Sequence, residues 1–257
     1  MLDDPDHDEK RDHDSPRLVE RAGTQRETGE RRRLRREEQM LGRNRLGAER
    51  NRGFFDGRRV LALNFVGSPG SGKTSLLERS IANEGIRRTW FVVQGDPATE
   101  FDAERVRRKG ARAAQLNTGT VSHLDAAMVA RAIAALDPRP GGIVAIENVG
   151  NLVCPALFDL GEHARVVVAS VTEGDDKPAK YPTMFRSASL VVLNKIDLLP
   201  YVDFDVGTFA EYVRDVNPDV PILQISAARG DGMATWYRWL DQRLSERGSL
   251  LHLVSLA

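Results

Sequence analysis

The fold of this chain is decided by Gly67-Ser68-Pro69-Gly70-Ser71-Gly72-Lys73-Thr74, which fits the pattern G-x-x-x-x-G-K-[ST]. The apolar run Val60–Val66 precedes this stretch and the helix-forming run Ser75–Arg79 follows it, which is the strand, loop and helix context that the motif requires. Glycines let the backbone aim N–H groups at phosphate oxygens, while Lys73 and the helix N-terminus add positive charge. The stretch therefore predicts a loop that binds nucleotide phosphates, with Thr74 placed to offer its hydroxyl to Mg²⁺.

Short apolar runs alternate with helical stretches over the rest of the chain. The expected strands are Val60–Val66, Thr89–Val93, Ala113–Asn117, Ile143–Ile146, Val166–Val171, Leu190–Leu193 and Ile222–Ile225. The expected helices are Thr74–Asn83, Asp102–Lys109, Leu124–Leu136, Phe209–Val216 and Met233–Arg247. Continuously apolar runs suit strands that are covered on both faces. The alternation predicts a doubly wound, mostly parallel α/β domain over residues 53–257.

The first 52 residues contain no aromatic side chain and have a different charge pattern. Residues 1–30, which begin with an aspartate-rich stretch, have too little apolar surface to offset the entropy of ordering, so we expect a disordered acidic tail. Residues 31–52 are rich in arginine, and we expect a helix there. A basic segment can contact nucleic acid, but glutamate is mixed with the arginine, which favours a solvated helix face and no nucleic-acid partner.

The overall composition excludes several classes of protein. The formal net charge is +0, so bulk electrostatics favours neither nucleic acid nor a membrane surface. The sequence has no apolar run long enough for a spanning helix and no basic segment that leads into an apolar one, so we expect no membrane association. Cys154 is the only cysteine, which rules out an intrachain disulfide and suits the reducing cytoplasm.

Two further segments fall at the ends of expected strands and indicate which base is bound. They are Asn194-Lys195-Ile196-Asp197 and Ser226-Ala227. The Asp197 carboxylate can accept hydrogen bonds from the ring N–H and the exocyclic amine of guanine, whereas adenine offers no such donor pair. We expect Asn194 to tie this loop to the phosphate loop and the Lys195 stem to cover the ring. Because ligands of open α/β sheets bind at the carboxyl ends of strands, the segments predict a single GTP site.

Two acidic residues are expected at the same edge of the sheet. Asp96 follows one apolar run, and Glu147 begins the sequence Glu147-Asn148-Val149-Gly150, where many GTPases have Asp-x-x-Gly. Asp96 is placed to bind Mg²⁺ through water or to position the attacking water, Glu147 to hold a Mg²⁺-bound water, and Gly150 to donate its N–H to the γ-phosphate. The alternative for either acid is a cap of the following helix, which is the role we expect for Asp102.

Three blocks of sequence are typical of one group of GTPases. They are Glu147–Glu162 (ENVGNLVCPALFDLGE), Ser170–Pro178 (SVTEGDDKP) and Asn194–Tyr201 (NKIDLLPY). Together they resemble the hydrogenase nickel-incorporation GTPases, the hydrogenase accessory protein B family, from about Arg43 to Leu240. The resemblance implies a GTP-hydrolysing maturation factor, dimeric when GTP is bound, that helps to load nickel into [NiFe]-hydrogenase. It also implies two partners, the small zinc-containing nickel chaperone of that pathway and the precursor of the hydrogenase large subunit.

The same resemblance implies a metal site made by a Cys-His pair and a second cysteine. The second cysteine corresponds to Cys154, but the pair is Ser122-His123 in this chain. A neutral serine hydroxyl is a poor ligand for Ni²⁺ or Zn²⁺. His123 and Cys154 remain as candidate ligands, and two facing protomers would supply two imidazoles and two thiolates, a tetrahedral set. The alternative is a small buried thiol beside an ordinary histidine.

Several functional interpretations stay open at this point. The leading one is a GTP-hydrolysing switch that turns over slowly, because no arginine finger or activating glutamine stands at a diagnostic position. The second is a GTP-regulated scaffold in hydrogenase maturation that carries no metal, which Ser122 favours. A urease-type accessory GTPase is a further alternative, although that group carries Cys-Pro-His where this chain has Cys154-Pro155-Ala156. A phosphate-loop kinase is less favoured because Asn194–Asp197 specifies guanine.

Overall fold

The computed structural model describes residues 16–96, 101–119 and 121–254. The chain divides into two units, Met1–Gly42 and Arg43–Ala257. The described part of the first unit is helical, and the side chains of residues 31–40 are exposed. Within the described residues, every helix is too short or too polar to cross a membrane.

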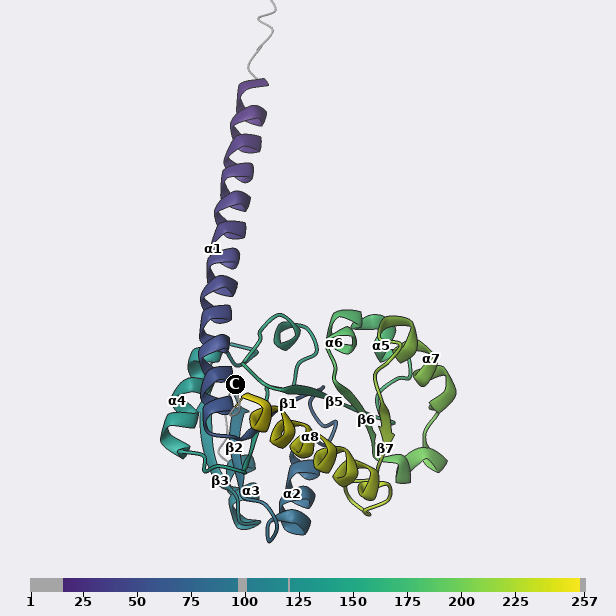
Figure 1. The fold of residues 1–257 in the computed structure, drawn as a ribbon. Helices are drawn as coiled ribbons and strands as arrows, with labels where there is room; N and C mark the ends of the chain where they lie inside the picture. Colours follow the sequence, from purple (N-terminus) through teal and green to yellow (C-terminus); the bar gives the residue numbers. More distant parts are fainter. Residues whose placement is uncertain (1–15, 97–100, 120, 255–257) are drawn as a thin grey trace, which may run out of the picture. The chain divides into compact units, whose positions relative to one another are not determined.

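The second unit is built on one sheet of seven parallel strands (Figure 1), in the order β3-β2-β4-β1-β5-β6-β7. The chain lays β2 and β3 on one side of β1, returns to insert β4 between β2 and β1, and then adds β5, β6 and β7 on the other side, which places a topological switch point beside β1. This architecture confirms the predicted doubly wound α/β domain. The strands are β1 (Leu61–Val66), β2 (Trp90–Asp96), β3 (Arg112–Asn117), β4 (Ile143–Glu147), β5 (Ala164–Ser170), β6 (Leu190–Asn194) and β7 (Ile222–Gln224).

The helices agree with the predicted ones within a few residues at their starts. Helix α4 begins at Ala126 instead of Leu124, because the Asp125 side chain accepts a hydrogen bond from Met128 N (2.7 Å) and caps the helix there. Four short helices were not predicted, since three to six residues leave no periodic pattern. The elements are α1 (Pro16–Gly57), α2 (Lys73–Glu84), α3 (Phe101–Arg108), α4 (Ala126–Leu136), η1 (Cys154–Ala156), α5 (Lys177–Lys180), α6 (Pro182–Arg186), η2 (Ile196–Tyr201), α7 (Val206–Val216) and α8 (Met233–Val254).

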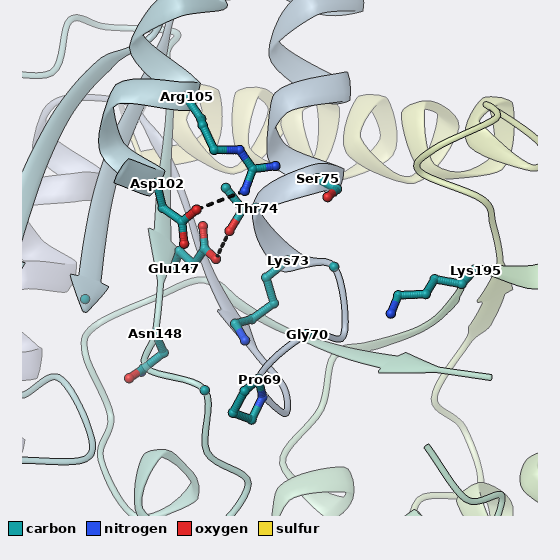
Figure 2. Close-up of a pocket in the computed structure, with 13 residues that line it drawn as sticks. Pro69, Gly70, Lys73, Thr74, Ser75, Asp102, Arg105, Glu147, Asn148 and Lys195 are labelled. Atoms are coloured by element: carbon teal, nitrogen blue, oxygen red, sulfur yellow. Dashed lines mark hydrogen bonds and ion pairs between the residues drawn. The ribbon is translucent and has the colours of Figure 1, made fainter. Parts of the chain in front are cut away.

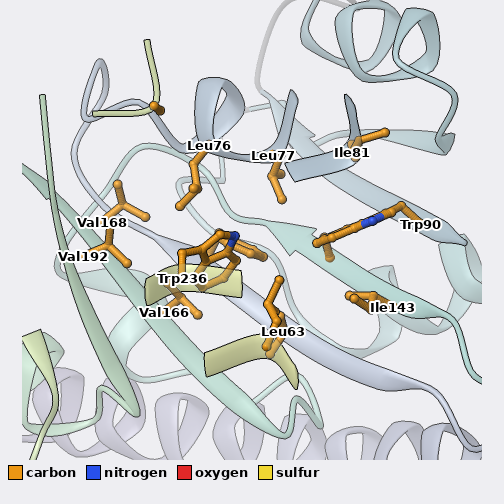
Figure 3. Packing of buried hydrophobic residues seen from close by; sticks show 14 of the residues in the cluster. Leu63, Leu76, Leu77, Ile81, Trp90, Ile143, Val166, Val168, Val192 and Trp236 are labelled. Carbon is orange, nitrogen blue, oxygen red and sulfur yellow. The ribbon is translucent and has the colours of Figure 1, made fainter. Parts of the chain in front are cut away.

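Alternate residues of the central strands pack on opposite faces of the sheet. On β5, Val166 and Val168 belong to one apolar cluster, whereas Val167 and Ala169 belong to another. The first cluster is filled by side chains of α2 and α8, including the buried Trp236 (Figure 3). The second cluster is filled from α6 and α7. Both faces are therefore covered, as the continuously apolar strand sequences predicted.

Helix α1 differs from the prediction at both ends. It begins at Pro16 and ends at Gly57, whereas a helix over residues 31–52 was expected. Nine of the fourteen residues at positions 17–30 are Arg, Glu, Gln, Leu or Ala, which have good helix propensity, and a proline is well placed in a first turn. Residues 1–15 of the expected tail lie outside the described part of the chain.

The division between the two units falls after Gly42, inside α1. The last turns of α1 belong to the second unit because polar and apolar side chains anchor them there. Asn44 Nδ2 donates to the backbone oxygen of Asp159 (2.7 Å), and Asn44 Oδ1 accepts from Ala126 N (2.8 Å). Phe55 is fully buried. These contacts tie the end of α1 to the segments that begin α4 and precede β5.

Candidate functional site

A cavity of about 580 Å³ opens at the carboxyl ends of the strands (Figure 2). The loop after β1, the last residues of β2 and β4, and the residue that follows β6 all reach it. This is the edge at which sequence reasoning placed the nucleotide. The lining residues are Pro69, Gly70, Gly72, Lys73, Thr74, Ser75, Gly95, Asp102, Arg105, Glu147, Asn148, Gly150 and Lys195.

Two glycines let chain segments approach closely at this edge. Gly72 has a φ of 96°, and a Cβ there would lie 2.2 Å from Asn194 Nδ2. At Gly150, a Cβ would lie 2.8 Å from the Pro69 side chain. Only glycine fits where the phosphate loop meets these two segments, so the packing requires glycine at both positions.

Lys73 lies buried at the floor of the phosphate loop. Its Nζ donates to the backbone oxygens of Gly67 (3.0 Å) and Ser68 (3.1 Å). Burial lowers the pKa of the ammonium, and the Glu147 carboxylate opposes that shift. Both hydrogen-bond partners are neutral, so an anionic phosphate would suit this ammonium better than its present environment.

Glu147 is a fully buried carboxylate at the end of β4. Thr74 Oγ1 donates to Glu147 Oε1 (2.6 Å), and Gln94 Nε2 donates to Glu147 Oε2 (2.8 Å). Burial raises the pKa of Glu147 to about 7, against the lowering influence of Lys73 and of the Thr74 hydrogen bond. A divalent cation beside this carboxylate would compensate for its lost solvation, so the Thr74–Glu147 pair fits Mg²⁺, which prefers oxygen ligands.

The end of β2 and the first turns of α3 hold charged residues, and two of them, Asp102 and Arg105, differ from what the sequence predicted. Asp96 is the last residue of β2, but its side chain lies outside the described part of the chain. Asp102 is not an N-cap, because α3 begins one residue earlier, at Phe101. Its carboxylate instead accepts a hydrogen bond from Arg105 Nη1 (2.9 Å), and both side chains line the cavity. Sequence reasoning missed Arg105, although the Asp-x-x-Arg spacing after a strand was a usable signal.

Asn194 joins the phosphate loop to the loops expected to bind the base. The side chain is 1% exposed; its Nδ2 donates to the backbone oxygen of Ser71 (3.0 Å) and its Oδ1 accepts from Ala227 N (3.0 Å). It also accepts from Lys195 N (2.8 Å). This is the connection expected from the sequence. Ser226 is buried beside it, and its Oγ accepts from Arg229 N (3.0 Å).

Asp197 carries a polar atom without a partner. Its Oδ1 is buried, and no hydrogen-bond donor among the described residues reaches it. Lys195, two residues earlier, has a φ of 63°, which is uncommon for a residue with a side chain and marks a constrained turn. An unpaired buried carboxylate oxygen costs free energy unless a ligand supplies the donor, which is what guanine would do here.

The candidate metal ligands lie in two segments that contact each other, the loop before α4 and the start of η1. Ser122 Oγ donates to Cys154 Sγ over 3.1 Å, so the structure brings together the two segments that the sequence singled out. The His123 ring stacks on Phe158 with a centroid distance of 3.8 Å, and burial lowers its pKa. Its Nδ1 is buried with no hydrogen-bond partner among the described residues. A neutral imidazole is the form that binds metal.

One protomer alone does not complete a metal site. No group of three or more His, Cys, Asp or Glu side chains with metal-binding geometry occurs within the described residues. The cluster therefore offers His123 and Cys154 at most as metal ligands, with the Ser122 hydroxyl hydrogen-bonded to the Cys154 sulfur. A tetrahedral N/S site needs four ligands.

Asn148 and Asn151 link this Ser122–His123–Cys154 cluster to the nucleotide cavity. Asn148 Oδ1 accepts from Leu124 N (3.1 Å), the residue after His123, and Asn151 Nδ2 donates to Ser122 O (3.4 Å). Both asparagines flank Gly150, which contacts the phosphate loop. The link was not predicted, because the contacts of a buried amide depend on which loops the fold brings together.

Comparisons with known proteins agree with this geometry. The family described as CobW/HypB/UreG, nucleotide-binding domain, matches residues 61–224. The hydrogenase maturation factor HypB of Azotobacter vinelandii is 52% identical over 214 residues, which cover 83% of this chain and 71% of that protein. The structure of HypB from Helicobacter pylori in complex with nickel gives a TM-score of 0.76 at 36% identity and covers 79% of this chain and 96% of that one.

A second solved structure, HypB from Archaeoglobus fulgidus, gives a TM-score of 0.74 at 39% identity and covers 79% of this chain and 99% of that one. The matched region contains the phosphate loop, the acidic strand ends and the Asn194–Asp197 loop described above. On fold, site and sequence together, the chain belongs to the CobW/HypB/UreG family of P-loop GTPases and, within it, to the HypB hydrogenase maturation factors.

Proposed function

We propose that this GTPase acts as a switch in the insertion of nickel into the large subunit of [NiFe]-hydrogenase, and that it dimerises when GTP is bound. The observation that carries the nucleotide part is the buried Oδ1 of Asp197, which has no donor among the described residues and lies in the same loop as Asn194, which is bonded to the phosphate loop. The nickel part is supported by the Helicobacter pylori HypB structure, which is described as a complex with nickel.

The side chains around the phosphates have distinct roles in this proposal. Lys73 would exchange the carbonyls of Gly67 and Ser68 for phosphate oxygens, and the Gly150 N–H would donate to the γ-phosphate. Thr74 and Asp96 would hold Mg²⁺, and Glu147 would bind one of its waters. When bound, the ion supplies positive charge to the phosphates.

The base would be held by the loops after β6 and β7. Asp197 would accept from the guanine ring N–H and amine, the Lys195 stem would cover the ring, and Ser226 and Ala227 would close the far side. The buried hydrogen bonds of Asn194 support this arrangement, because they fix both loops to the phosphate loop before any ligand binds.

A dimer would complete the metal site. His123 and Cys154 from each protomer would provide four ligands for Ni²⁺ or Zn²⁺. The apolar side chains around the cluster support such a contact, since Val121, Val153 and Leu157 are 43%, 56% and 58% exposed. The two proposed partners in nickel delivery are the small zinc-containing nickel chaperone of the pathway and the hydrogenase large-subunit precursor.

A second candidate function is a GTP-regulated scaffold in hydrogenase maturation that carries no nickel itself. The observation that favours it is Ser122, whose hydroxyl occupies a position 3.1 Å from the Cys154 sulfur, where a thiolate would be a better ligand. A urease-type role has less support, because Ala156 stands where that group carries a histidine.

The experiment that separates these functions measures metal binding against nucleotide state. The full chain is loaded with a non-hydrolysable GTP analogue or with GDP, its mass is followed by light scattering, and Ni²⁺ or Zn²⁺ is titrated by equilibrium dialysis. We expect a dimer with the GTP analogue only, one metal ion per dimer, and no binding by Cys154→Ala.

Ser122→Cys is the matched variant for this titration. The additional sulfur ligand from each protomer should tighten metal binding by roughly tenfold or more. A confirmed dimer of the unmodified chain that binds neither metal would establish the scaffold instead. A chain that stays monomeric with the GTP analogue would contradict dimerisation as the switch.

A further inference from the structure

Arg105 is a cation of the nucleotide cavity that the proposed roles above leave unused. It lies in α3, three residues after Asp102. Its guanidinium reaches the side of the cavity where Thr74 lies (Figure 2). Nε and Nη2 donate to the two carboxylate oxygens of Glu78 in α2, over 3.2 Å and 2.6 Å. Nη1 donates to Asp102 Oδ1 over 2.9 Å.

These contacts hold the guanidinium without exhausting it. A guanidinium has five N–H donors, and the contacts above with Glu78 and Asp102 use three of them. The Arg105 side chain is 42% exposed. Its charge also acts inside the site, because it offsets a small part of the rise that burial causes in the pKa of Glu147. Arg105 is therefore anchored from one side and open to a ligand from the other.

The other arginines of α3 make a clear contrast. Arg107 donates to the backbone oxygen of Ala113, and Arg108 forms an i,i+4 ion pair with Glu104. Neither of these two side chains lines the cavity. Arg105 alone among the arginines of this helix is directed to the place where phosphates would bind, so the proposal rests on its position and not on the basic character of α3.

A ligand that binds Arg105 has to compete with the carboxylates that hold it. The cavity is lined by Asp102 and Glu147 together with Lys73, Arg105 and Lys195, and Glu78, which pairs with Arg105, makes three carboxylates to three cations. The triphosphate brings more negative charge than the diphosphate, and guanidinium groups recognise phosphate oxygens with paired N–H donors. The γ-phosphate of GTP can therefore compete with Glu78 and Asp102 for Arg105, whereas GDP has no γ-phosphate to do so.

We propose that Arg105 contacts the phosphates of GTP from within the same chain and distinguishes GTP from GDP, and that Glu78 holds the guanidinium aside until the triphosphate binds. This inference rests on the proposed GTP site and deepens it. In this proposal, Arg105 is an arginine finger supplied by the same chain, which was not recognised from the sequence. Helix α3 is then the element that detects the γ-phosphate.

The test compares nucleotide affinities of full-length variants. Dissociation constants for fluorescent GTP-analogue and GDP probes are measured by titration, together with kcat and KM for GTP. For Arg105→Ala, we expect the Kd for the GTP analogue to rise roughly tenfold to hundredfold, with the GDP value within about threefold of the unmodified chain. We expect kcat to fall by at least a similar factor.

Two further variants separate ligand binding from structural support. Glu78→Gln removes the competing carboxylate charge, so we expect it to tighten GTP-analogue binding a few-fold and to leave GDP unchanged. Arg108→Ala is the matched control, because it removes an ion pair of the same helix outside the cavity, and we expect unmodified behaviour. If Arg105→Ala unfolds, Arg105→Gln must show the same loss of GTP preference.

The possible failures are distinguishable. If Arg105→Ala lost GTP and GDP affinity equally, and Glu78→Gln showed the same losses, the Arg105–Glu78 pair would be structural. That result would overturn this inference and leave the proposed GTP site standing. Behaviour of Arg105→Ala like that of Arg108→Ala would also overturn it. Failure of the unmodified chain to bind either nucleotide would overturn the proposed GTP site and this inference with it.

Discussion

The nucleotide site and the Ser122–His123–Cys154 cluster are held by the fold in different ways. In the nucleotide site, Asn194 is buried and bonded to three backbone groups, and Thr74 is bonded to the buried Glu147. The cluster instead sits in the loop before α4 and in η1, with exposed apolar neighbours, and among the described residues one hydrogen bond joins its members, Ser122 Oγ to Cys154 Sγ over 3.1 Å. The first site is shaped before its ligand arrives, whereas the proposed metal site would need a second copy of the chain to complete its ligand set.

The largest effect should follow from removing the ammonium at the floor of the phosphate loop. We expect Lys73→Ala to lower kcat/KM for GTP by at least about a hundredfold, because a desolvated positive charge at the phosphates is lost. Phosphate release assays on the full chain measure this. Lys109→Ala removes an exposed lysine elsewhere and should hydrolyse GTP normally. If both variants were equally active, the loop would not be the catalytic phosphate site.

His163 and His123 differ in the same way, because His163 is hydrogen-bonded to the central strand β1 and His123 lies in the cluster. His163 Nδ1 accepts from Ala62 N (2.9 Å), and its Nε2 lies 3.1 Å from Asp56 Oδ1. Burial, with a further contribution from Arg247, lowers the pKa of His163 to about 4 from an ordinary value of 6.5, against the opposing effect of Asp56. Protonation would also remove the acceptor that Ala62 N uses.

This depressed pKa predicts a pH-dependent stability. The unfolded chain binds more protons than the folded one between pH 6.5 and 4, so the free energy of unfolding should fall by up to about 3 kcal/mol as the pH is lowered through that window. Urea denaturation at several pH values measures it. His163→Asn, whose Oδ1 can still accept from Ala62, should flatten the slope, and His123→Asn should change it less. An unchanged slope in His163→Asn would contradict the assignment.

Removing one polar side chain from each region should separate their contributions to stability. Asn194→Ala leaves the Ala227 N–H and the Ser71 carbonyl unpaired in a buried place, so we expect a loss of about 2 kcal/mol in the free energy of unfolding. Cys154→Ala removes a half-buried thiol and should cost less than about 1 kcal/mol. Equilibrium urea denaturation compares the two variants directly. Equal losses in the free energy of unfolding would contradict the difference between the two regions.

Much of the nucleotide site could be predicted because its residues act through local sequence. The glycines of the phosphate loop and the Asn-Lys-x-Asp segment demand particular backbone geometries that a short pattern records. Asn194 was expected to connect the loops, and its hydrogen bonds do so. The strands followed from continuously apolar runs.

What sequence reasoning missed depends on contacts between distant segments. Arg105 reaches the cavity only because α3 packs beside α2 and Glu78 anchors the guanidinium, 27 residues away in the chain. Asp102 was misread as a cap because helix starts are uncertain by a residue or two. The Asn148 and Asn151 bonds to the Ser122–His123 loop likewise depend on tertiary packing.

The central claim is that this chain carries a guanine-specific site made by Asp197 at one end and the phosphate loop at the other. Asp197→Asn tests it most directly, because an amide donates where the carboxylate accepts and therefore suits the oxygen that xanthine carries in place of the guanine amine. Titration of GTP and XTP analogues should show at least a tenfold loss for GTP and a reversal of preference toward XTP. An unchanged preference for GTP in this variant would contradict the account.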